Sequence, residues 1–133
     1  MVRVMAFGTF DQFHAGHLSF LWQAKKLGEE LLVVVARDAT VVTVKGRTPV
    51  QPEQERLLQI NLVEYVDRAI LGGYHDRYAV IRQHQPKVIC LGYDQVAFTK
   101  SLARLFPRIR IVRAQPFYPE RYKTSLRLGN GGK

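Results

Sequence analysis

The segment Gly8–His17 has the sequence Gly-Thr-Phe-Asp-Gln-Phe-His-Ala-Gly-His, which combines residue types suited to binding phosphate. Gly8 permits a tight turn after an apolar run, and Gly16 removes a side chain where a ligand would approach the start of a helix. Free N–H groups and the helix dipole at such a start favour anions. His14 and His17 are three residues apart, so both imidazoles project to one side and can donate hydrogen bonds to phosphate oxygens.

The residues of this segment also allow two simpler interpretations. Two polar residues can merely begin a helix. A His-x-x-His pair can bind a metal ion, but it lacks the i,i+4 spacing and the nearby carboxylate of the zinc-binding helix. Because Gly8 and Thr9 precede the His pair and Gly16 lies within it, we favour a phosphate-binding turn.

A second group of candidate residues consists of cations that follow the second apolar run of the chain. Arg37 comes directly after that run, and Lys45-Gly46-Arg47 lies on a segment able to close over phosphates. Arginine can bind phosphate in a bidentate manner, and lysine acts as a point charge. One isolated surface cation is ordinarily just solvated. Arg56 adds a further cation, and several cations on successive segments favour anion binding.

The third candidate site is Gly92-Tyr93-Asp94-Gln95, which follows a short apolar run. Gly92 lets the backbone come close to a ligand. Asp94 can accept a hydrogen bond from a ribose hydroxyl or an amino group, and it can also cap the next helix. The two roles are compatible.

The fourth candidate site is Lys123-Thr124-Ser125-Leu126-Arg127. Thr124 or Ser125 can cap a final helix whose N–H groups point at phosphate, although Gly129 limits that helix to a short turn. Tyr122 lies just before this segment, and its ring can pack on an aromatic ligand or can simply anchor the loop.

The elements that must position these residues alternate between strand and helix. Apolar runs predict strands over 2–7, 31–36, 68–71, 88–91 and 109–112. Helices are predicted over 18–27, 52–63, 78–84 and 99–106, and residues 37–51 are predicted to be mostly loop. The alternation predicts an α/β fold with a parallel sheet of about five strands and helices on both faces. Ligands of such sheets bind beyond the carboxyl ends of the strands, where the candidate residues are placed.

Helical periodicity also predicts which residues of two helices are buried. In the first helix, Leu18, Leu21 and Trp22 are predicted to share one face, which Phe20, Ala24 and Leu27 widen. The buried side of the second helix is predicted to consist of Leu57, Leu58, Ile60, Leu62 and Val63.

Length and composition bound the class of protein. The chain has 133 residues, which predicts one domain over 1–133 with a frayed tail over 128–133. Its single cysteine excludes an internal disulfide framework and a cysteine-rich metal cluster. Neither a membrane span nor a signal-peptide layout is found, so a cytoplasmic protein without membrane association is expected. The net charge of +9 implies an anionic partner.

The string GTFDQFHAGH resembles the signature of the nucleotidyltransferase superfamily with the H-x-G-H motif. That resemblance implies a Rossmann-like domain that transfers a nucleotidyl group to a phosphorylated acceptor and releases pyrophosphate. Later segments (Val35-Ala36-Arg37-Asp38, Lys45-Gly46-Arg47, Ala69-Ile70-Leu71-Gly72 and Leu91-Gly92-Tyr93-Asp94-Gln95) are similar to archaeal-type FAD synthase. The resemblance implies ATP and FMN as substrates, Mg²⁺ with the triphosphate, and a homodimer.

The resemblance also implies a role for each candidate residue. The expected catalytic residues are His14, His17, Lys45 and Arg47. The nucleotide is expected to contact Gly8, Thr9, Phe10, Gly16, His17, Gly92, Asp94, Thr124 and Ser125. The acceptor is expected to contact Asp11, Arg37, Arg56 and Tyr122. Asp11 would orient the acceptor or support a metal ion, or else act as a turn residue; no protein metal site is expected.

Two other functions are compatible with the sequence. A cytidylyltransferase would use CTP and a small phosphorylated alcohol such as glycerol 3-phosphate. A non-catalytic nucleotide- or nucleic-acid-binding module is suggested by the net charge of +9 and by the late cations Arg104, Arg108, Arg110 and Arg113. Nucleic-acid binders usually combine basic clusters with base-stacking aromatics or show a recognisable module. The late cations do cluster, so this function stays open, although two phosphorylated small molecules are the expected partners and nucleic acid is not. The role of the late cations stays open.

Overall fold

Five parallel strands form the centre of the computed structural model, which describes residues 1–95 and 99–117. The strands are β1 (Arg3–Gly8), β2 (Glu30–Val35), β3 (Arg68–Leu71), β4 (Val88–Leu91) and β5 (Arg110–Arg113). Their order in the sheet is β3-β2-β1-β4-β5, and every neighbouring pair is parallel. The predicted strands are therefore confirmed, each to within one residue at either end.

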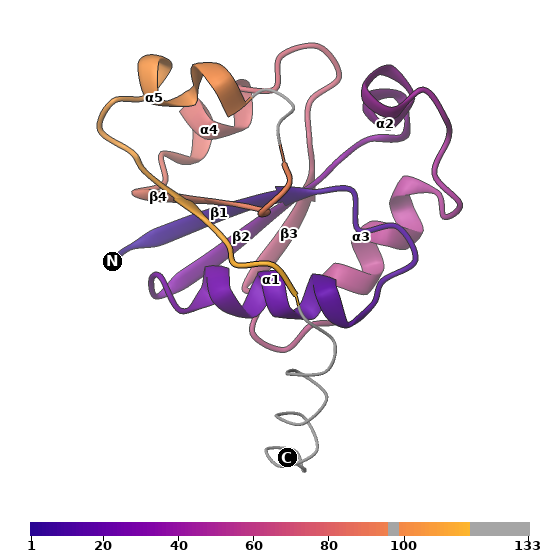
Figure 1. Ribbon diagram of the computed structural model, residues 1–133, viewed down its shortest axis with the longest axis horizontal. Coiled ribbons are helices and arrows are strands. Elements are labelled where there is room, and N and C mark those ends of the chain that lie inside the picture. Colours follow the sequence, from indigo (N-terminus) through magenta and orange to yellow (C-terminus); the bar gives the residue numbers. More distant parts are fainter. Residues whose placement is uncertain (96–98, 118–133) are drawn as a thin grey trace.

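Helices cover both faces of this sheet (Figure 1). They are α1 (Ala15–Lys25), α2 (Asp38–Lys45), α3 (Glu53–Asn61), α4 (Ala79–His84) and α5 (Leu102–Leu105), the last preceded by a 3₁₀ turn, η1 (Thr99–Ser101). Figure 1 shows α1 and α3 together along one face and α4 and α5 on the other. The α/β prediction, a Rossmann-like parallel sheet with helices on both faces, is confirmed.

The sequence of β2 shows why both faces are covered. Leu31, Val33 and Val35 belong to the apolar cluster that includes Leu21 of α1. Leu32 and Val34 belong to the cluster that includes Val80 and Leu102. Successive side chains of a strand point to opposite faces, so a continuous apolar run buries both.

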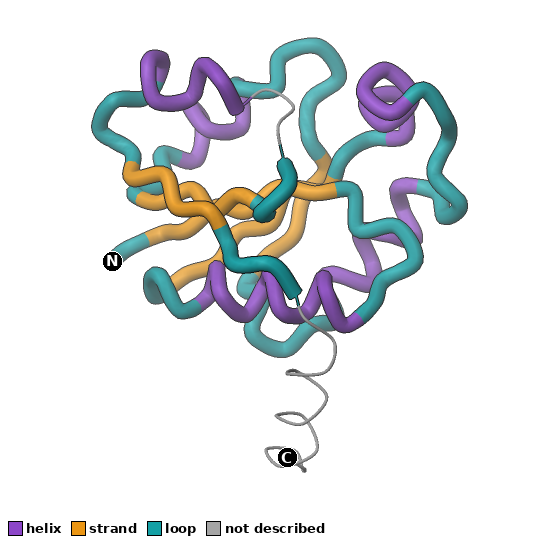
Figure 2. The backbone as a smooth tube through the Cα atoms, in the orientation of Figure 1, coloured by secondary structure: helices purple, strands orange, loops and turns teal. Residues whose placement is uncertain are grey.

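The order of the strands also fixes where a ligand can enter. The chain runs outward from β1 to β2 and β3 on one side, and β4 and β5 then extend the sheet on the other side. The loops that follow the strands leave at the same end of the sheet, as Figure 2 shows for β1, β2 and β3. A crevice is expected at the point where the order reverses, beyond the carboxyl ends of β1 and β4.

Residues 37–51, predicted to be mostly loop, contain the helix α2. Its sequence, Asp-Ala-Thr-Val-Val-Thr-Val-Lys, is rich in β-branched residues, which have low helix propensity. The helix ends where Gly46 adopts the left-handed conformation (φ 76°), a common helix C-terminus. Tertiary contacts of Val41, which is buried, outweigh the weak local preference.

The buried faces of α1 and α3 are also partly different from those predicted. Leu18 and Trp22 are 40% and 49% exposed, and the buried residues of α1 are Ser19, Leu21 and Ala24. Apolar residues surround α1 on several sides, so periodicity alone did not select the face that packs on the sheet. In α3, likewise, Leu58 and Leu62 are 60% and 74% exposed.

Candidate active site

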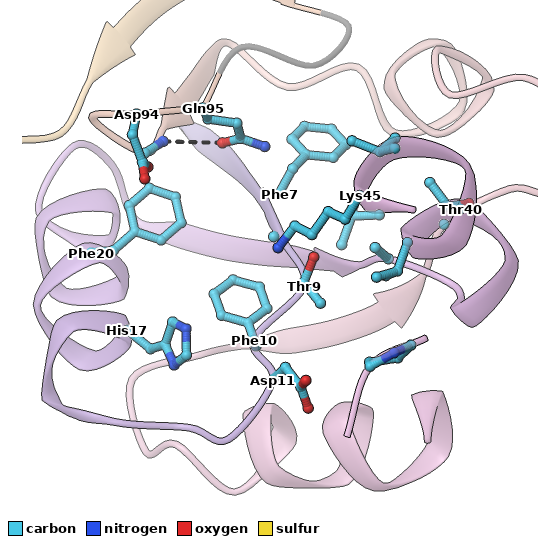
Figure 3. Close-up of a pocket in the computed structure, with 18 of the residues that line it drawn as sticks. Phe7, Thr9, Phe10, Asp11, His17, Phe20, Thr40, Lys45, Asp94 and Gln95 are labelled. Carbon is cyan, nitrogen blue, oxygen red and sulfur yellow. Dashed lines mark hydrogen bonds between the residues drawn. The ribbon is translucent and has the colours of Figure 1, made fainter. Parts of the chain in front are cut away.

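A cavity of about 790 Å³ lies at the carboxyl ends of the strands. It brings together most of the predicted site residues: Gly8, Thr9, Phe10, Asp11, His14, Gly16, His17, Arg37, Lys45, Arg47, Gly92 and Asp94. Arg56 does not line it, and Tyr122, Thr124 and Ser125 lie outside the described residues. Figure 3 shows side chains from the first strand, α1, α2 and the loop after β4 converging on this space.

The two histidines form a reciprocal cap at the start of α1. His14 Nδ1 accepts a hydrogen bond from the Gly16 N–H at 3.0 Å, and His17 Nδ1 accepts one from the His14 N–H at 3.1 Å. The imidazole rings are stacked, with 3.9 Å between their centroids. Because each Nδ1 acts as an acceptor, we assign the proton of each neutral ring to Nε2. Both Nε2–H groups are then hydrogen-bond donors that can serve a phosphate.

Two glycines make this arrangement possible. A Cβ at Gly8 would lie 2.7 Å from Cζ of Phe10, and a Cβ at Gly16 would lie 2.8 Å from Cε1 of His14. Phe10 has φ 56° and is buried, with its ring 5.5 Å from that of His17. The missing side chain at Gly8 therefore leaves space for the Phe10 ring, which packs against His17. The missing side chain at Gly16 leaves space for the His14 ring, in addition to the ligand approach predicted from the sequence.

The environment of His17 keeps its ring neutral. Burial, followed by the nearby charges of His14 and Lys45, lowers the pKa of His17 to about 4, against an opposing effect of Asp11. A positive charge on the partly buried His17 ring would lie close to the charge of Lys45, which is unfavourable. At neutral pH His17 is therefore a neutral donor through Nε2–H and not a cation.

Lys45 and Arg47 lie on the opposite side of the cavity from α1. Lys45 is the last residue of α2, and its side chain extends toward Thr9 at the end of β1 (Figure 3). Both cations are exposed and line the cavity. This placement suits binding of a polyphosphate between Lys45, Arg47 and the His pair.

Arg37 lines the cavity but is held mainly by the protein. Its Nε donates to the carbonyl of Gly72 at 2.8 Å, and its Nη1 lies 3.3 Å from a carboxylate oxygen of Glu53. The guanidinium also lies over the ring of Tyr74, 4.1 Å from its centroid. Arg37 thus joins the ends of β2 and β3 to the start of α3, and the predicted acceptor contact of Arg37 stays a prediction.

The structure corrects the predicted role of Arg56. Its side chain is 0% exposed. Nη1 donates to the carbonyls of Thr9 and Ala36 at 2.8 Å each, Nε donates to the carbonyl of Gln51 at 2.9 Å, and Nη2 contacts Asp38 Oδ1 at 2.6 Å. A guanidinium enclosed in this way does not reach an acceptor phosphate. Arg56 instead fixes the backbone of three segments beside the cavity.

Asp11 lines the cavity and holds two loops together, while its predicted role toward the acceptor or a metal ion stays a prediction. Its two carboxylate oxygens accept hydrogen bonds from the N–H groups of Val50 and Gln51, at 2.8 and 2.9 Å. Burial by itself raises the pKa of Asp11, but these two bonds and the charges of Arg56 and Arg47 hold it below its usual value. The carboxylate therefore ties the loop after β1 to the segment before α3.

Hydrogen bonds from a side chain of the neighbouring strand β5 fix the loop after β4. Arg113 Nη1 donates to the carbonyls of Gly92 and Gln95, at 2.8 Å each. The Gly92 N–H donates to Gln95 Oε1 at 3.0 Å, the bond drawn in Figure 3. Asp94 is left exposed at the cavity edge. One of the late cations, Arg113, thus supports the predicted nucleotide loop, a role that the sequence did not reveal.

Sequence reasoning also missed the apolar part of the cavity lining. These residues are Phe7, Phe20, Val34, Val41, Val44 and Val80. They come from β1, α1, β2, α2 and α4. In the sequence each one looks like an ordinary core residue of its own element, so no local pattern distinguishes it as part of a site. Arg77, from the loop after β3, also lines the cavity and was also missed, because a single arginine in a loop carries no local signal of a site.

In the ranges 1–95 and 99–117 there is no group of three or more His, Cys, Asp or Glu residues that could hold a metal ion. Within the same ranges, no helix has the length and apolar character needed to cross a membrane.

Comparison with known proteins agrees with the resemblance noted for Gly8–His17. The sequence model of the cytidylyltransferase-like family matches residues 5–125. The chain therefore belongs to the cytidylyltransferase-like family. Within that family it is of the archaeal FAD synthase type, as two curated relatives indicate.

The two relatives are both named FAD synthase. The chain is 48% identical to that of Archaeoglobus profundus over 102 residues, which are 77% of this chain and 64% of the relative. It is 44% identical to that of Thermoplasma acidophilum over 121 residues, which are 88% of this chain and 84% of the relative. The chain thus spans just under two thirds of the first relative and most of the second.

A crystal structure from Thermoplasma volcanium has the same fold. Its title describes a lipopolysaccharide core biosynthesis protein. It superposes with a TM-score of 0.84 at 41% sequence identity, covering 89% of this chain and 99% of that one.

Proposed function

We propose that this protein transfers AMP from ATP to the phosphate of FMN, giving FAD and pyrophosphate. An oxygen of the FMN phosphate attacks the α-phosphorus of ATP. A new P–O bond forms, the bond from the α-phosphorus to the bridging oxygen breaks, and pyrophosphate leaves. The observation that carries the proposal is that His14 and His17 both line the cavity and both accept a backbone N–H at Nδ1, which leaves Nε2 of each ring to donate. The naming of its relatives as FAD synthases supports FMN as the acceptor.

The residues of the site suit this reaction without a general base. A phosphate monoester has a second pKa of about 6, so the acceptor is already mostly dianionic at neutral pH. Lys45 and Arg47 would neutralise charge on the triphosphate, and the two Nε2–H groups would donate to oxygens on which charge develops. Catalysis then comes from positioning and electrostatic stabilisation.

Mg²⁺ would accompany the triphosphate. It usually keeps several waters and binds through substrate phosphates and one or two carboxylates. The carboxylates of Asp11 and Asp94 line the cavity, so the residues present fit this mode of binding. When bound, the ion would neutralise phosphate charge; the protein would contribute Lys45, Arg47 and the His pair around it.

Four further features belong to the proposal. Thr124 and Ser125 would add donors to the phosphates, and Tyr122 would contact the flavin. The enzyme would act in the cytoplasm as a homodimer, which light scattering of the purified protein would test.

The direct test is to incubate the purified protein with ATP, FMN and Mg²⁺ and to separate the products by chromatography. We expect FAD and pyrophosphate in equal amounts. The family is described as cytidylyltransferase-like, which favours a cytidylyltransferase as the competing function. A parallel reaction with CTP and glycerol 3-phosphate is therefore included. Product in that reaction and none with FMN would contradict the proposal.

Variants of the His pair test its catalytic role. We expect His14→Ala and His17→Ala each to lower kcat by about 10²- to 10³-fold, the usual cost of removing one transition-state donor. The matched control is His75→Ala, since His75 is exposed and does not line this cavity. Wild-type turnover in both site variants would refute the assignment.

A further inference from the structure

Gln51, which lies just before α3, has a hydrogen-bond partner for each of its four polar groups. Its Oε1 accepts from the Gln12 N–H at 2.8 Å, and its own N–H donates to Asp11 Oδ1 at 2.9 Å. Its Nε2 donates to Glu55 Oε1 at 3.1 Å, and its carbonyl accepts from Arg56 Nε at 2.9 Å. The partners fix the orientation of the amide, since a backbone N–H only donates and a carboxylate only accepts.

The loop that Gln51 contacts has a backbone conformation that its own residues do not favour. Phe10 and Gln12 have φ values of 56° and 51°, in the left-handed region that residues with a Cβ rarely adopt. Such conformations persist when the surrounding structure holds them in place. The bond from Gln12 to Gln51 and the two bonds that Asp11 accepts supply that support. The same loop leads into His14, the N-cap of α1.

The other segment in this contact follows directly on two cations of the cavity, Lys45 and Arg47. Arg47 is four positions before Gln51, and the residues between them include Thr48 and Pro49, which line the cavity. Proline fixes its own φ angle, so this short connection has little freedom. The contacts of Gln51 therefore limit how far Arg47 can lie from the loop that leads to the His pair.

Resting on the proposed function, we infer that Gln51 is a positioning residue for AMP transfer, which holds two sides of the cavity at a fixed separation. One side carries the His pair and the other carries Lys45 and Arg47; Figure 3 shows His17 and Lys45 on these two sides. Gln51 itself does not line the cavity, so it acts on the reaction only through the residues that it holds.

The expected effect is on the reaction step more than on substrate binding. Donors aimed at developing charge act when they are placed to within about 0.5 Å, and a misplacement of about 1 Å can cost about 100-fold in rate. Lysine has a long flexible stem and can follow a phosphate that moves slightly. An imidazole on its short stem cannot, so loosening of the loop after β1 would affect the His pair first.

Two neighbouring glutamines provide a matched test. Gln51→Met removes the acceptor for Gln12 and keeps the size of the side chain, and Gln54→Met makes the same change at an exposed position of α3 that does not line the cavity. FAD formation would be measured at varied ATP and FMN, with folding checked by circular dichroism. We expect Gln51→Met to lower kcat about tenfold and to leave both KM values within about twofold. Gln54→Met should leave all three constants within about twofold of the wild type.

An exchange of side chains provides a rescue. Gln51→Glu combined with Glu55→Gln keeps the net charge, puts a carboxylate oxygen in the place of Oε1, and leaves an amide at position 55 to donate to the other carboxylate oxygen. We expect this double variant to return kcat to within about threefold of the wild type. Gln51→Glu alone should recover less, because two carboxylates would then face each other.

Proton NMR of the histidine rings gives a readout that does not depend on turnover. The chain has four histidines, of which His75 and His84 do not line the cavity. The rings of His14 and His17 are stacked, with 3.9 Å between their centroids, so their signals report on the loop before α1. We expect Gln51→Met to shift or broaden the signals of these two rings and to leave those of His75 and His84 in place.

Several results would overturn the inference. They are wild-type kcat in Gln51→Met, an equal loss of kcat in Gln54→Met, a rise in KM at unchanged kcat, a double variant as slow as Gln51→Met, or unchanged ring signals of the His pair. If Gln51→Met does not fold, Gln51→Asn replaces it; its amide is one methylene short of the Gln12 N–H and should lower kcat about threefold.

The two kinds of failure are distinguishable. Ring signals of the His pair that Gln51→Met perturbs, in a protein that forms no FAD, would refute the proposed function alone. FAD formation that Gln51→Met leaves unchanged would refute this inference alone.

Discussion

Replacement of Arg56 by methionine should destabilise the protein more than replacement of any exposed arginine. The side chain is 0% exposed and donates to three backbone carbonyls, those of Thr9, Ala36 and Gln51. A buried acceptor left without a donor costs about 1–3 kcal/mol. Three such groups set a range of about 3–9 kcal/mol, and entry of water near the partly exposed Asp38 favours its lower end.

A loss of this size is a large share of the total stability of a small domain, which is about 5–15 kcal/mol. Urea denaturation of the wild type, Arg56→Met and Arg56→Lys would measure it, followed by circular dichroism and by the fluorescence of Trp22, the single tryptophan. We expect Arg56→Met to lose at least about 3 kcal/mol and Arg56→Lys to lose less, since lysine keeps the charge and up to three donors.

The control is Arg108→Met, which removes an exposed arginine from the loop before β5. Its unfolding free energy should stay within about 0.5 kcal/mol of the wild type. A loss below about 1 kcal/mol for Arg56→Met would refute the reasoning, because the three carbonyls would then not depend on the guanidinium.

Three further predictions concern the site. Burial and nearby positive charges lower the pKa of His17 from 6.5 to about 4. As the pH falls, the unfolded chain therefore takes up the proton at a higher pH than the folded protein does. Unfolding free energy should therefore fall as pH decreases from 6.5 to about 4, and urea titrations should show a flatter profile for His17→Gln; equal profiles would contradict this. Lys45→Met should lower kcat/KM for ATP by about 10- to 100-fold, while Lys87→Met, at an exposed position, should not. Arg113→Met should raise the KM for ATP by about three- to tenfold through the loop after β4, with Arg110→Met on the same strand as the control.

The strands and the phosphate-binding turn could be predicted from the sequence because their signals are local. The runs 68–71 and 88–91 match β3 and β4 residue for residue, since a buried parallel strand is a continuous apolar run between polar breaks. The spacing of His14, Gly16 and His17 likewise needs only the geometry of one helix start. The helix α2 was missed, because its β-branched residues give a weak local signal and its stability comes from packing.

The site could be predicted only in part. The sequence predicted that Lys45 and the His pair lie at the same edge of the sheet. The cavity lining confirms their location, and their roles stay predictions. The sequence also predicted that Arg56 contacts the ligand, because it is a cation close to the edge of the sheet where ligands bind. Whether such a side chain turns outward or inward depends on which carbonyls other segments bring near it, and no pattern in α3 contains that information.

By itself, the sequence determined an α/β protein with a glycine- and histidine-containing turn at the start of a helix, since turn chemistry and strand periodicity act over a few residues. Only the tertiary structure decided that Asp11 and Arg56 hold the loops, and that Val34, Val41, Val44 and Val80 line one cavity. These facts depend on contacts between residues tens of positions apart. Such contacts arise when packing of the whole sheet brings the ends of its strands together.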